Sequence, residues 1–230
     1  KQIEEVGIKE IISDIRNGNI KGINVTVPFK KKVIGFMDEL SSFAKQTESV
    51  NIVYTEKKKI IGGNTDVPGF GASLNHINYN LKGKTVLILG AGGVVPSIIV
   101  ALNSMQVSKI VISNRTKEKA ETLKKKFPFI NLLPWGELGD FDMIINATSI
   151  GLKNNDKTPV DLNKVQSGKF FYDVIYNPKK TSFLLEAKKR KNQVENGKMM
   201  FIYQAQLSFE IWHGIKPKID KKVLELLEND

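Results

Sequence analysis

The sequence predicts an α/β protein that is divided into two domains. The first observation is that short apolar segments alternate with helical ones from residue 85 onward. Strands that are apolar along nearly their whole length are typical of a parallel sheet covered by helices on both faces. The second is the short polar stretch Leu81–Lys84, after which the pattern changes. The third is the length of 230 residues, which is enough for two modest domains with buried cores.

The part before residue 81 mixes helices with short strands. Ile8, Ile11, Ile12 and Ile15 have the spacing of one helical face, and Asn17–Gly18 ends that helix. The further elements that we predict here are a strand at 20–27, a helix through Phe36 and 38–45, strands at 49–55 and 59–63, and a helix that begins within 64–70.

The part after residue 84 alternates regularly between strand and helix. We predict strands at 85–90, 109–113, 143–147 and 170–176, a helix from Pro96 and a helix over Lys117–Lys126. The tail from Lys198 predicts two helices that are divided near Gly214–Pro217. The order of these elements is that of a parallel sheet with crossover helices.

Composition excludes several kinds of chemistry. With no cysteine, the chain has no disulfide, no thiolate nucleophile and no Cys-ligated zinc. Its two histidines, His76 and His213, are far apart in sequence, so we expect no metal site. A chain without cysteine is compatible with a reducing compartment, and we expect a cytoplasmic location.

The net charge of +11 raises nucleic acid as a partner. The lysines are scattered, however, and only three residues are arginine, the side chain that nucleic-acid interfaces favour for bidentate contacts. We therefore expect no nucleic-acid function, and attraction of small anions is the better explanation. A basic nucleic-acid-binding protein, or one without catalytic activity, is the alternative from a different class.

The stretch Thr85–Ser108 carries no charge and is long enough to resemble a membrane span. Glycines and Pro96 interrupt it, and its second half contains Asn103 and Gln106. Two buried elements joined by a glycine turn explain it better, so we expect no membrane partner. The chain begins at Lys1 rather than at a methionine, and no signal peptide is recognisable.

A glycine-rich turn between a predicted strand and helix indicates a dinucleotide site. Residues 85–97 read TVLILGAGGVVPS, in which Gly90 and Gly92 fit the G-x-G-x-x-G/A pattern and Gly93 adds room. Glycines permit a tight turn and close approach of a pyrophosphate to the helix N-terminus. The third position is Val95, which departs from the pattern. A purely structural glycine turn is the alternative.

The end of the next predicted strand distinguishes the cofactor. An NAD site usually has Asp or Glu about 20 residues beyond the glycines, to hold the ribose hydroxyls. Here the strand ends in Asn114, Arg115 and Thr116, with Lys119 a helical step further on. A guanidinium can bind a 2′-phosphate or stack on adenine, so we predict NADP rather than NAD. The alternative is that Thr116 caps a helix and Arg115 is a surface residue.

Three short stretches carry polar residues beside predicted strands. Residues 22–30 (GINVTVPFK) end in Lys30, Asn51 lies in a strand, and Asp66 follows a strand in the turn at 62–66 (GGNTD). Taken singly, each has an ordinary structural explanation, since most lysines are solvated and most Asx turns are structural. Their combination with a dinucleotide site favours a shared active site.

These stretches resemble the shikimate dehydrogenase family, together with GAGG, NRT, NATSIG, DVIYNP and GKMMFIYQAQLSFEIWHG. The resemblance runs from about Lys21 to Gly214, with the motifs in the family's order. It implies a discontinuous α/β substrate domain at 1–81 plus 203–230 and a Rossmann-type NADP-binding domain with a parallel sheet at 82–202. It also implies reversible NADPH-dependent reduction of 3-dehydroshikimate to shikimate, on the way to aromatic amino acids. For the oligomeric state we expect a monomer or a homodimer, between which the sequence does not distinguish.

The resemblance assigns roles to individual residues. Lys30 and Asp66 would be the catalytic pair. The substrate would be surrounded by Asn24, Thr26, Lys30, Asn51, Asp66 and Gln204, with Tyr176 near both substrate and nicotinamide. The cofactor would lie against Gly90, Ala91, Gly92, Gly93, Asn114, Arg115, Thr116, Lys119, Asn146, Thr148, Ser149 and the backbone around Gly197.

These roles agree with the chemistry of the reaction. Reduction of a ketone requires a hydride at carbon and a proton at oxygen, so a proton donor such as Lys30 must reach that oxygen. The neighbouring Lys31 and Lys32 and a helix N-terminus disfavour the charged amine, whereas Asp66 favours it. The protonation state of Lys30 is therefore left open. Amide and hydroxyl side chains suit a ring that carries several hydroxyl groups. Asn24 and Thr26 would share one face of their strand.

The sequence departs from the family's pattern in several places. The family's Ser-x-Ser motif, which holds the substrate carboxylate, is not found before Lys21. Either it lies upstream of Lys1 or the carboxylate is held otherwise. Ile52, Val95–Pro96 and Lys198 are lesser departures. A quinate/shikimate dehydrogenase that uses NAD would share nearly every motif, while a methylenetetrahydrofolate dehydrogenase would fit the lysine and aspartate stretches less well.

Overall fold

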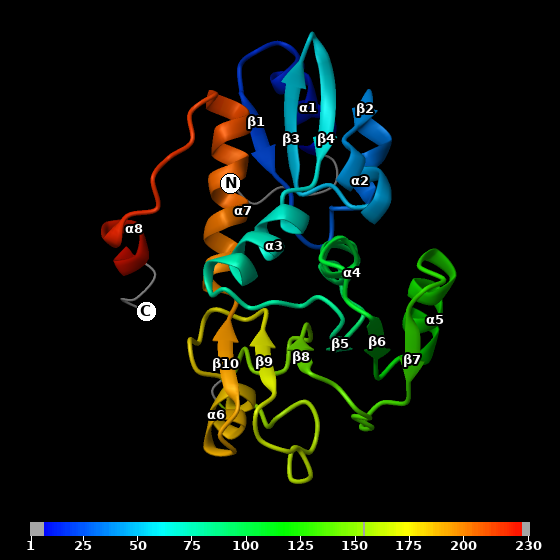
Figure 1. The fold of residues 1–230 in the computed structure, drawn as a ribbon. Helices are drawn as coiled ribbons and strands as arrows, with labels where there is room; N and C mark the ends of the chain where they lie inside the picture. The colour runs from blue at the N-terminus through cyan, green and yellow to red at the C-terminus, as the bar shows by residue number, and fades with distance from the viewer. Residues whose placement is uncertain (1–6, 154, 227–230) are drawn as a thin grey trace.

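The computed structural model describes residues 7–153 and 155–226, and it contains two separate β-sheets (Figure 1). A four-stranded sheet with the order β1-β3-β4-β2 lies at the top of the view, and a six-stranded sheet lies below it. This confirms the predicted two-part α/β architecture. The domain ranges expected from the sequence include residues 1–6 and 227–230, which lie outside the described part of the chain.

The four-stranded sheet is built around a hairpin. β3 (Ile52–Glu56) and β4 (Lys59–Gly63) are antiparallel, and the two residues between them both have positive φ, as hairpin turns of type I′ require. β1 (Gly22–Asn24) adds to β3, and β2 (Glu39–Leu40) adds to β4. The predicted first helix is confirmed as α1 (Gly7–Arg16), which buries Ile8, Ile12 and Ile15 in the core of this half.

Two predictions in this half were wrong in extent. The strand expected at 20–27 covers only β1, because the chain turns where Phe29 N–H donates to the Thr26 carbonyl at 2.8 Å. Thr26 therefore lies outside the strand, and strand alternation does not place it beside Asn24. The helix expected through Phe36 and 38–45 is instead a 3₁₀ helix, η1 (Lys32–Phe36), then β2 and α2 (Ser42–Thr47).

The interruption of that helix has a visible cause. The Asp38 carboxylate accepts a hydrogen bond from Ile60 N–H at 2.7 Å and pairs with Arg16 at 3.0 Å, which draws the segment to the edge of β4. Helix α2 then begins at Ser42 and is capped by Ser41, whose hydroxyl accepts from Ala44 N–H at 3.3 Å.

The six-stranded sheet is parallel throughout and has the order β10-β9-β8-β5-β6-β7. This is the strand order of a doubly wound dinucleotide-binding sheet, so the predicted class is confirmed. Its strands are β5 (Thr85–Leu89), β6 (Lys109–Ser113), β7 (Asn131–Leu133), β8 (Met143–Asn146), β9 (Phe170–Asp173) and β10 (Gln193–Asn196). The two edge strands were not predicted, because they are short and partly polar.

Helices cover both faces of this sheet. α4 (Val95–Ser104) and α5 (Lys117–Lys126) belong to the core on one face, as predicted. The other face is covered by α6 (Ser182–Lys189), which the sequence analysis missed, and by the segment around Val160 and Leu162. In 7–153 and 155–226, no helix is long and apolar enough to span a membrane, and no group of acidic or histidine side chains is arranged to hold a metal ion.

Two helices, α3 (Asp66–His76) and α7 (Lys198–His213), connect the sheets (Figure 1). They cross closely, since a Cβ on Gly69 would lie 2.9 Å from Gln204 Cβ. At the far end of α7, Trp212 Nε1 donates to the Val53 carbonyl at 3.2 Å. The last described element is α8 (Lys221–Leu226), so the two predicted helices of the tail are confirmed.

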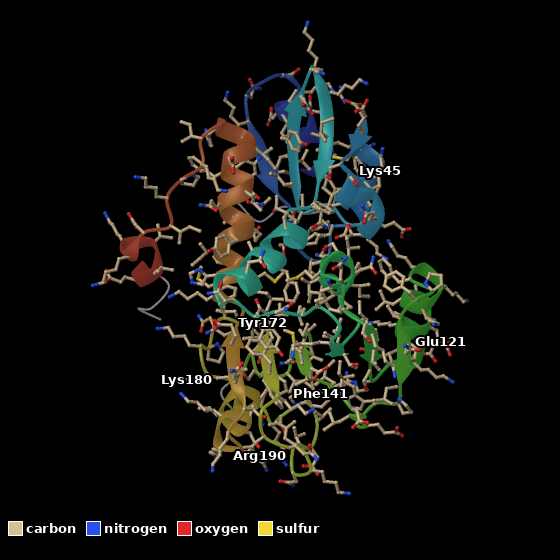
Figure 2. All side chains as sticks on the ribbon, in the orientation of Figure 1. Lys45, Glu121, Phe141, Tyr172, Lys180 and Arg190 are labelled. Carbon is tan, nitrogen blue, oxygen red and sulfur yellow. The ribbon has the colours of Figure 1, made fainter. Side chains whose placement is uncertain are left out.

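Phe70 makes an apolar contact between α3 and the parallel sheet. Its ring meets that of Tyr172 edge-on with centroids 5.3 Å apart, and both side chains are fully buried. Ser73 Oγ and Tyr172 Oη lie 3.2 Å apart in the same layer. Figure 2 labels Tyr172 where the six-stranded sheet meets α3.

We expect Phe70→Ala to lower the free energy of unfolding by about 3–5 kcal/mol, because it leaves a cavity between α3 and β9. Urea unfolding followed by circular dichroism measures this loss. Phe129→Ala is the control, since Phe129 is half exposed and should cost little. Equal losses in the two variants would contradict the assigned packing.

Candidate active site

The glycine turn lies at the point where the parallel sheet reverses its strand order, between the ends of β5 and β8. Gly90 has φ of 110°, and a Cβ there would lie 2.9 Å from the Ala147 carbonyl oxygen. Only glycine satisfies both conditions. Helix α4 follows directly, with Pro96 in its first turn and Val95 fully buried in the core. The strand, turn and helix predicted from the sequence are confirmed. Val95, at the third position of the glycine pattern, packs into the core between helix and sheet.

The residues after β6 lie beside this turn. Gly90 N–H donates to the Ser113 carbonyl at 2.8 Å, which places the end of β6 next to the glycines. Asn114 Nδ2 donates to the Thr116 carbonyl at 2.7 Å and shapes the loop before α5. Arg115, Thr116 and Lys119 are exposed. Thr116 stands at the N-cap of α5, but its side chain makes no capping hydrogen bond.

The loop after β8 is held by Asn146, whose side chain is fully buried. Its Oδ1 accepts from Thr148 N–H at 3.1 Å and from Thr148 Oγ1 at 2.7 Å. Its Nδ2 donates to the Ile150 carbonyl at 3.0 Å and to Asp173 Oδ1 at 3.1 Å. Thr148 and Ser149 are at least partly exposed above it. Asn146 therefore supports the loop from below.

Asp173 is a buried residue of this region that the sequence analysis missed. Besides Asn146, its carboxylate accepts from Ile175 N–H at 3.0 Å and from Thr181 Oγ1 at 2.6 Å. Thr181 is itself the N-cap of α6. Burial raises the pKa of Asp173 to about 6, although these hydrogen bonds oppose the rise. The signal in the sequence was an acid that ends the apolar strand FFYD.

Lys30 and Asp66 form an ion pair, with Lys30 Nζ 2.6 Å from Asp66 Oδ2. Lys30 comes from the turn before η1, and its carbonyl accepts from Val50 N–H at 2.9 Å, which ties the turn to the segment before β3. Asp66 is the first residue of α3. The Lys30 side chain is 15% exposed and that of Asp66 is 9% exposed, so the pair is open to a small ligand without being fully solvated.

Asn51 completes the polar cluster around this pair. Its Nδ2 donates to Asp66 Oδ1 at 2.8 Å and to Thr65 Oγ1 at 2.9 Å, and its Oδ1 accepts from Thr65 N–H at 2.7 Å. Both Asn51 and Thr65 are buried. Asn51 therefore fixes one carboxylate oxygen of Asp66 while Lys30 contacts the other.

Helix α7 joins the cluster through Ser208, which the sequence analysis also missed. Asn24 Nδ2 donates to Ser208 Oγ and to the Asn51 carbonyl, each at 3.2 Å. Ser208 Oγ also lies 3.1 Å from Thr65 Oγ1 and donates to the Gln204 carbonyl at 2.9 Å. A serine inside a helix gives no sequence signal, because only the packing of α7 shows what it faces.

The other predicted substrate residues lie around this cluster in different ways. Gln204 packs on the first turn of α3 opposite Gly69, while its Nε2 donates to the Phe201 carbonyl at 3.0 Å. Thr26 is exposed in the turn before Lys30. Tyr176 is partly exposed and stacks on Phe201 with ring centroids 4.6 Å apart.

Gly197 brings the end of β9 against the start of α7. A Cβ on Gly197 would lie 2.0 Å from the Val174 carbonyl oxygen, so no other residue fits there. Its N–H donates to the Ile175 carbonyl at 3.2 Å. The segment that carries Tyr176 is thereby held beside the helix that carries Gln204.

The lysine turn and the glycine turn approach each other. A Cβ on Gly93 would lie 3.6 Å from Cγ2 of Val27, three residues before Lys30. Val27 is 67% exposed although it is apolar. The two predicted groups of site residues, one from each half, therefore lie next to each other.

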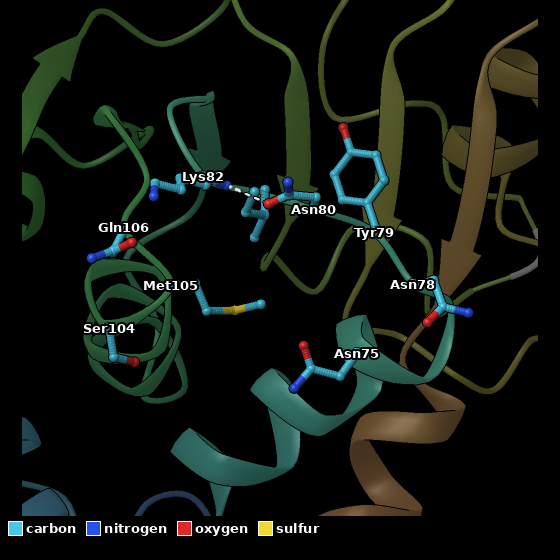
Figure 3. A pocket seen from close by; sticks show the side chains of 9 residues that line it. Asn75, Asn78, Tyr79, Asn80, Lys82, Ser104, Met105 and Gln106 are labelled. Atoms are coloured by element: carbon cyan, nitrogen blue, oxygen red, sulfur yellow. Dashed lines mark hydrogen bonds between the residues drawn. The ribbon is translucent and has the colours of Figure 1, made fainter.

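A hollow of about 580 Å³ lies at the joint between the two halves (Figure 3). It is lined by the end of α3, the segment 78–82 and the end of α4, with Asn80 Oδ1 accepting from Lys82 N–H at 3.0 Å. None of the predicted site residues lines it, so the candidate site remains the region around Lys30, Asp66 and the glycine turn.

Comparison with known proteins agrees with this arrangement. Residues 1–53 match the model of the shikimate dehydrogenase substrate binding domain, residues 73–176 that of shikimate / quinate 5-dehydrogenase, and residues 200–221 that of the shikimate 5′-dehydrogenase C-terminal domain. A protein of Pelagibacter ubique (strain HTCC1062) named shikimate dehydrogenase (NADP(+)) is 55% identical over 221 residues, which are 96% of this chain and 83% of that protein. The chain belongs to the shikimate dehydrogenase family.

Solved structures of shikimate dehydrogenases have the same fold. The enzyme from Aquifex aeolicus is 34% identical with a TM-score of 0.88, covering 99% of this chain and 84% of that one. The enzyme from Thermus thermophilus, in complex with NADP(H) and shikimate, is 28% identical with a TM-score of 0.87, covering 98% and 84%. The family resemblance inferred from the motifs is confirmed.

Asp173 should make stability depend on pH in a defined direction. Because its pKa is raised in the folded state, the folded protein holds this proton more tightly than the unfolded chain between about pH 4 and pH 6. The stabilisation from that proton is therefore lost as pH rises through this window. Relative to Asp173→Asn, the wild type should lose on the order of 2–3 kcal/mol between pH 4 and pH 6.5, measured by chemical unfolding.

Asp140→Asn is the matched control, because it removes the same charge from an exposed position. If the stability of wild type and Asp173→Asn ran parallel across this window, Asp173 would not be the titrating group.

Proposed function

We propose that this chain catalyses the reversible NADP(H)-dependent reduction of 3-dehydroshikimate to shikimate, a step toward aromatic amino acids. The observation that carries the proposal is the Lys30–Asp66 pair, 2.6 Å apart, beside a glycine turn that is shaped for a dinucleotide. Membership of the family and the NADP-dependent relative named above support it.

The cofactor site fits a dinucleotide phosphate in two respects. The glycine turn leaves no room for a side chain at Gly90, and it opens onto the N-terminus of α4, where backbone N–H groups favour negative charge. Arg115 and Lys119 are exposed beside it and suit a 2′-phosphate. The residues to which we assign cofactor contacts are Gly90, Ala91, Gly92, Gly93, Asn114, Arg115, Thr116, Lys119, Thr148, Ser149 and the backbone of Gly197, with Asn146 holding their loop.

Bound NADPH supplies the hydride, and the protein supplies the proton. Lys30 gives a proton to the carbonyl oxygen as the C–H bond forms, and it takes that proton back in the oxidation direction. Asp66 pairs with the amine and orients it. With one oxygen held by Asn51 and the other by Lys30, this carboxylate has a fixed direction before the substrate arrives.

The polar residues around this pair suit a ring with several hydroxyl groups. Asn24 ends β1, and Asn51 lies directly before β3 rather than in a strand as expected; both carry amides, and Thr26 and Gln204 flank them from the turn and from α7. A site built from such groups rejects analogues that leave them unpaired. Tyr176, at the end of the β9 segment, would contact both substrate and nicotinamide.

We also propose the domain division expected from the sequence, with a substrate domain at 1–81 plus 203–230 and a cofactor domain at 82–202. The separate sheets and the polar joint at Leu81–Lys84 support it, and α7 crosses the second boundary. A cytoplasmic location and a monomeric or homodimeric state belong to the same proposal.

Lys30→Ala should lower turnover of 3-dehydroshikimate by about 10²–10⁴-fold, because it removes the proton donor. The affinity for NADPH should be nearly unchanged, since Lys30 lies in the other half of the molecule. NADPH oxidation at 340 nm and cofactor titration measure the two effects. Lys31→Ala, at the exposed neighbouring lysine, is the control. A near-normal rate for Lys30→Ala would refute the assignment.

Arg115→Ala should weaken NADPH binding by about 10–100-fold, the value of a charge-assisted hydrogen bond, and change NADH binding little. Arg16→Ala is the control, because that arginine pairs with Asp38 in the other half. The assay is run with both cofactors and with both shikimate and quinate. Tighter binding of NADH by the wild type, with turnover of quinate, would favour an NAD-dependent quinate/shikimate dehydrogenase.

A further inference from the structure

Asn64 is a buried amide immediately before the catalytic segment Thr65–Asp66, and it is 4% exposed. Its Oδ1 accepts from Val67 N–H at 3.2 Å, so it holds the first turn of α3, where Asp66 lies. Its Nδ2 faces the Ser49 carbonyl at 2.9 Å and Thr47 Oγ1 at 3.1 Å, at the end of α2. One side chain thus fixes the start of α3 within the substrate half.

The same amide also reaches the cofactor half. Asn64 Nδ2 lies 3.1 Å from Ser97 Oγ, and Ser97 Oγ can donate to Asn64 Oδ1 at 3.4 Å. Ser97 is fully buried in the first turn of α4, directly after the glycine turn. Asp66 is therefore connected to the start of α4, the helix end proposed to face the pyrophosphate. The connection runs along the backbone from Asp66 to Asn64 and then through the side-chain contact between Asn64 and Ser97.

This contact has a geometric consequence for the proposed reaction. The substrate is oriented from α3 and the lysine turn, whereas the cofactor is oriented from the start of α4. Hydride transfer depends on the separation of these two ligands, and a misplacement of 1 Å can cost about 10²-fold in rate. A polar contact buried between the two helix starts sets this separation, because sliding one helix would take the buried Ser97 hydroxyl away from Asn64.

We propose that Asn64 and Ser97 are positioning residues, which align the Lys30–Asp66 pair with the glycine turn so that hydride transfer is fast. Neither residue contacts substrate or cofactor in this proposal, which rests on the proposed function. Loss of their contact is expected to slow the chemical step and to leave the affinity for each ligand nearly unchanged.

Ser97→Ala tests the proposal by removing one oxygen atom. Asn64 keeps its acceptors at Thr47 and Ser49, so the variant should fold. We expect the single-turnover oxidation of NADPH to slow about tenfold, with binding of NADP and of shikimate changed less than about threefold. NADPH deuterated at the transferred position should give a larger isotope effect on steady-state turnover than in the wild type, because hydride transfer then limits the rate.

Ser73→Ala is the matched control. Ser73 is also a fully buried serine, and its hydroxyl also crosses between the halves, at 3.2 Å from Tyr172 Oη. It lies about two turns along α3 from Asp66, so its loss should leave the single-turnover rate nearly unchanged. An equal slowing in Ser73→Ala would overturn the proposal, because general loosening between the halves would then explain both variants.

Two further outcomes would also overturn it. One is an unchanged single-turnover rate and isotope effect in Ser97→Ala. The other concerns Ser97→Thr, which keeps the hydroxyl group and which we expect to resemble the wild type. A Ser97→Thr variant as slow as Ser97→Ala would contradict the proposal. Inactivity of the wild type toward 3-dehydroshikimate would instead refute the proposed function, and it is recognised before any variant is compared.

Discussion

The pairing of Lys30 with Asp66 depends on two segments 36 residues apart being held at the same end of the four-stranded sheet. Lys30 is anchored through its carbonyl to Val50, and Asp66 is anchored through its carboxylate to Asn51. These anchors are consecutive residues leading into β3. One short stretch of backbone therefore sets both partners, and the geometry of the pair follows from the position of that strand.

The parallel sheet uses a comparable device on the cofactor side. Asn146 and Asp173 end adjacent strands and hydrogen-bond to each other, and each then holds the loop that follows its own strand. Burying a carboxylate costs free energy, which is visible in the raised pKa of Asp173. Hydrogen bonds from Asn146, Ile175 and Thr181 to the Asp173 carboxylate offset that cost. The loops after β8 and β9 are thereby anchored to buried side chains. Buried polar groups thus hold these loops in place, while Thr148, Ser149 and Tyr176 on the loops stay exposed or partly exposed.

The two halves are joined by apolar packing and by a few buried polar contacts. Phe70 and Tyr172 supply one apolar contact, and the close crossing of α3 and α7 at Gly69 brings Gln204 and Ser208 to the polar cluster around Lys30 and Asp66. The hydrogen bond between Asn64 and Ser97 constrains the relative orientation of the two halves, because a hydrogen bond limits orientation more narrowly than apolar contact does. A two-part enzyme needs both, since its reacting groups are carried by different halves.

The sequence by itself determined the strands with continuous apolar runs and the glycine turn, and it predicted a shared site for Lys30, Asn51 and Asp66, which the structure brings together. These features are local, because hydrophobic runs, glycine spacing and short motifs are properties of neighbouring residues. The sequence analysis made the strand at 20–27 too long and missed β7 and β10. These two strands are short and partly polar, and they form because they pair with β6 and β9 at the edges of the sheet. Only the tertiary structure decided the parts played by Asn64, Ser97, Asp173 and Ser208. Each is a small polar residue whose role depends on a partner brought close by folding, and no local pattern encodes that partner.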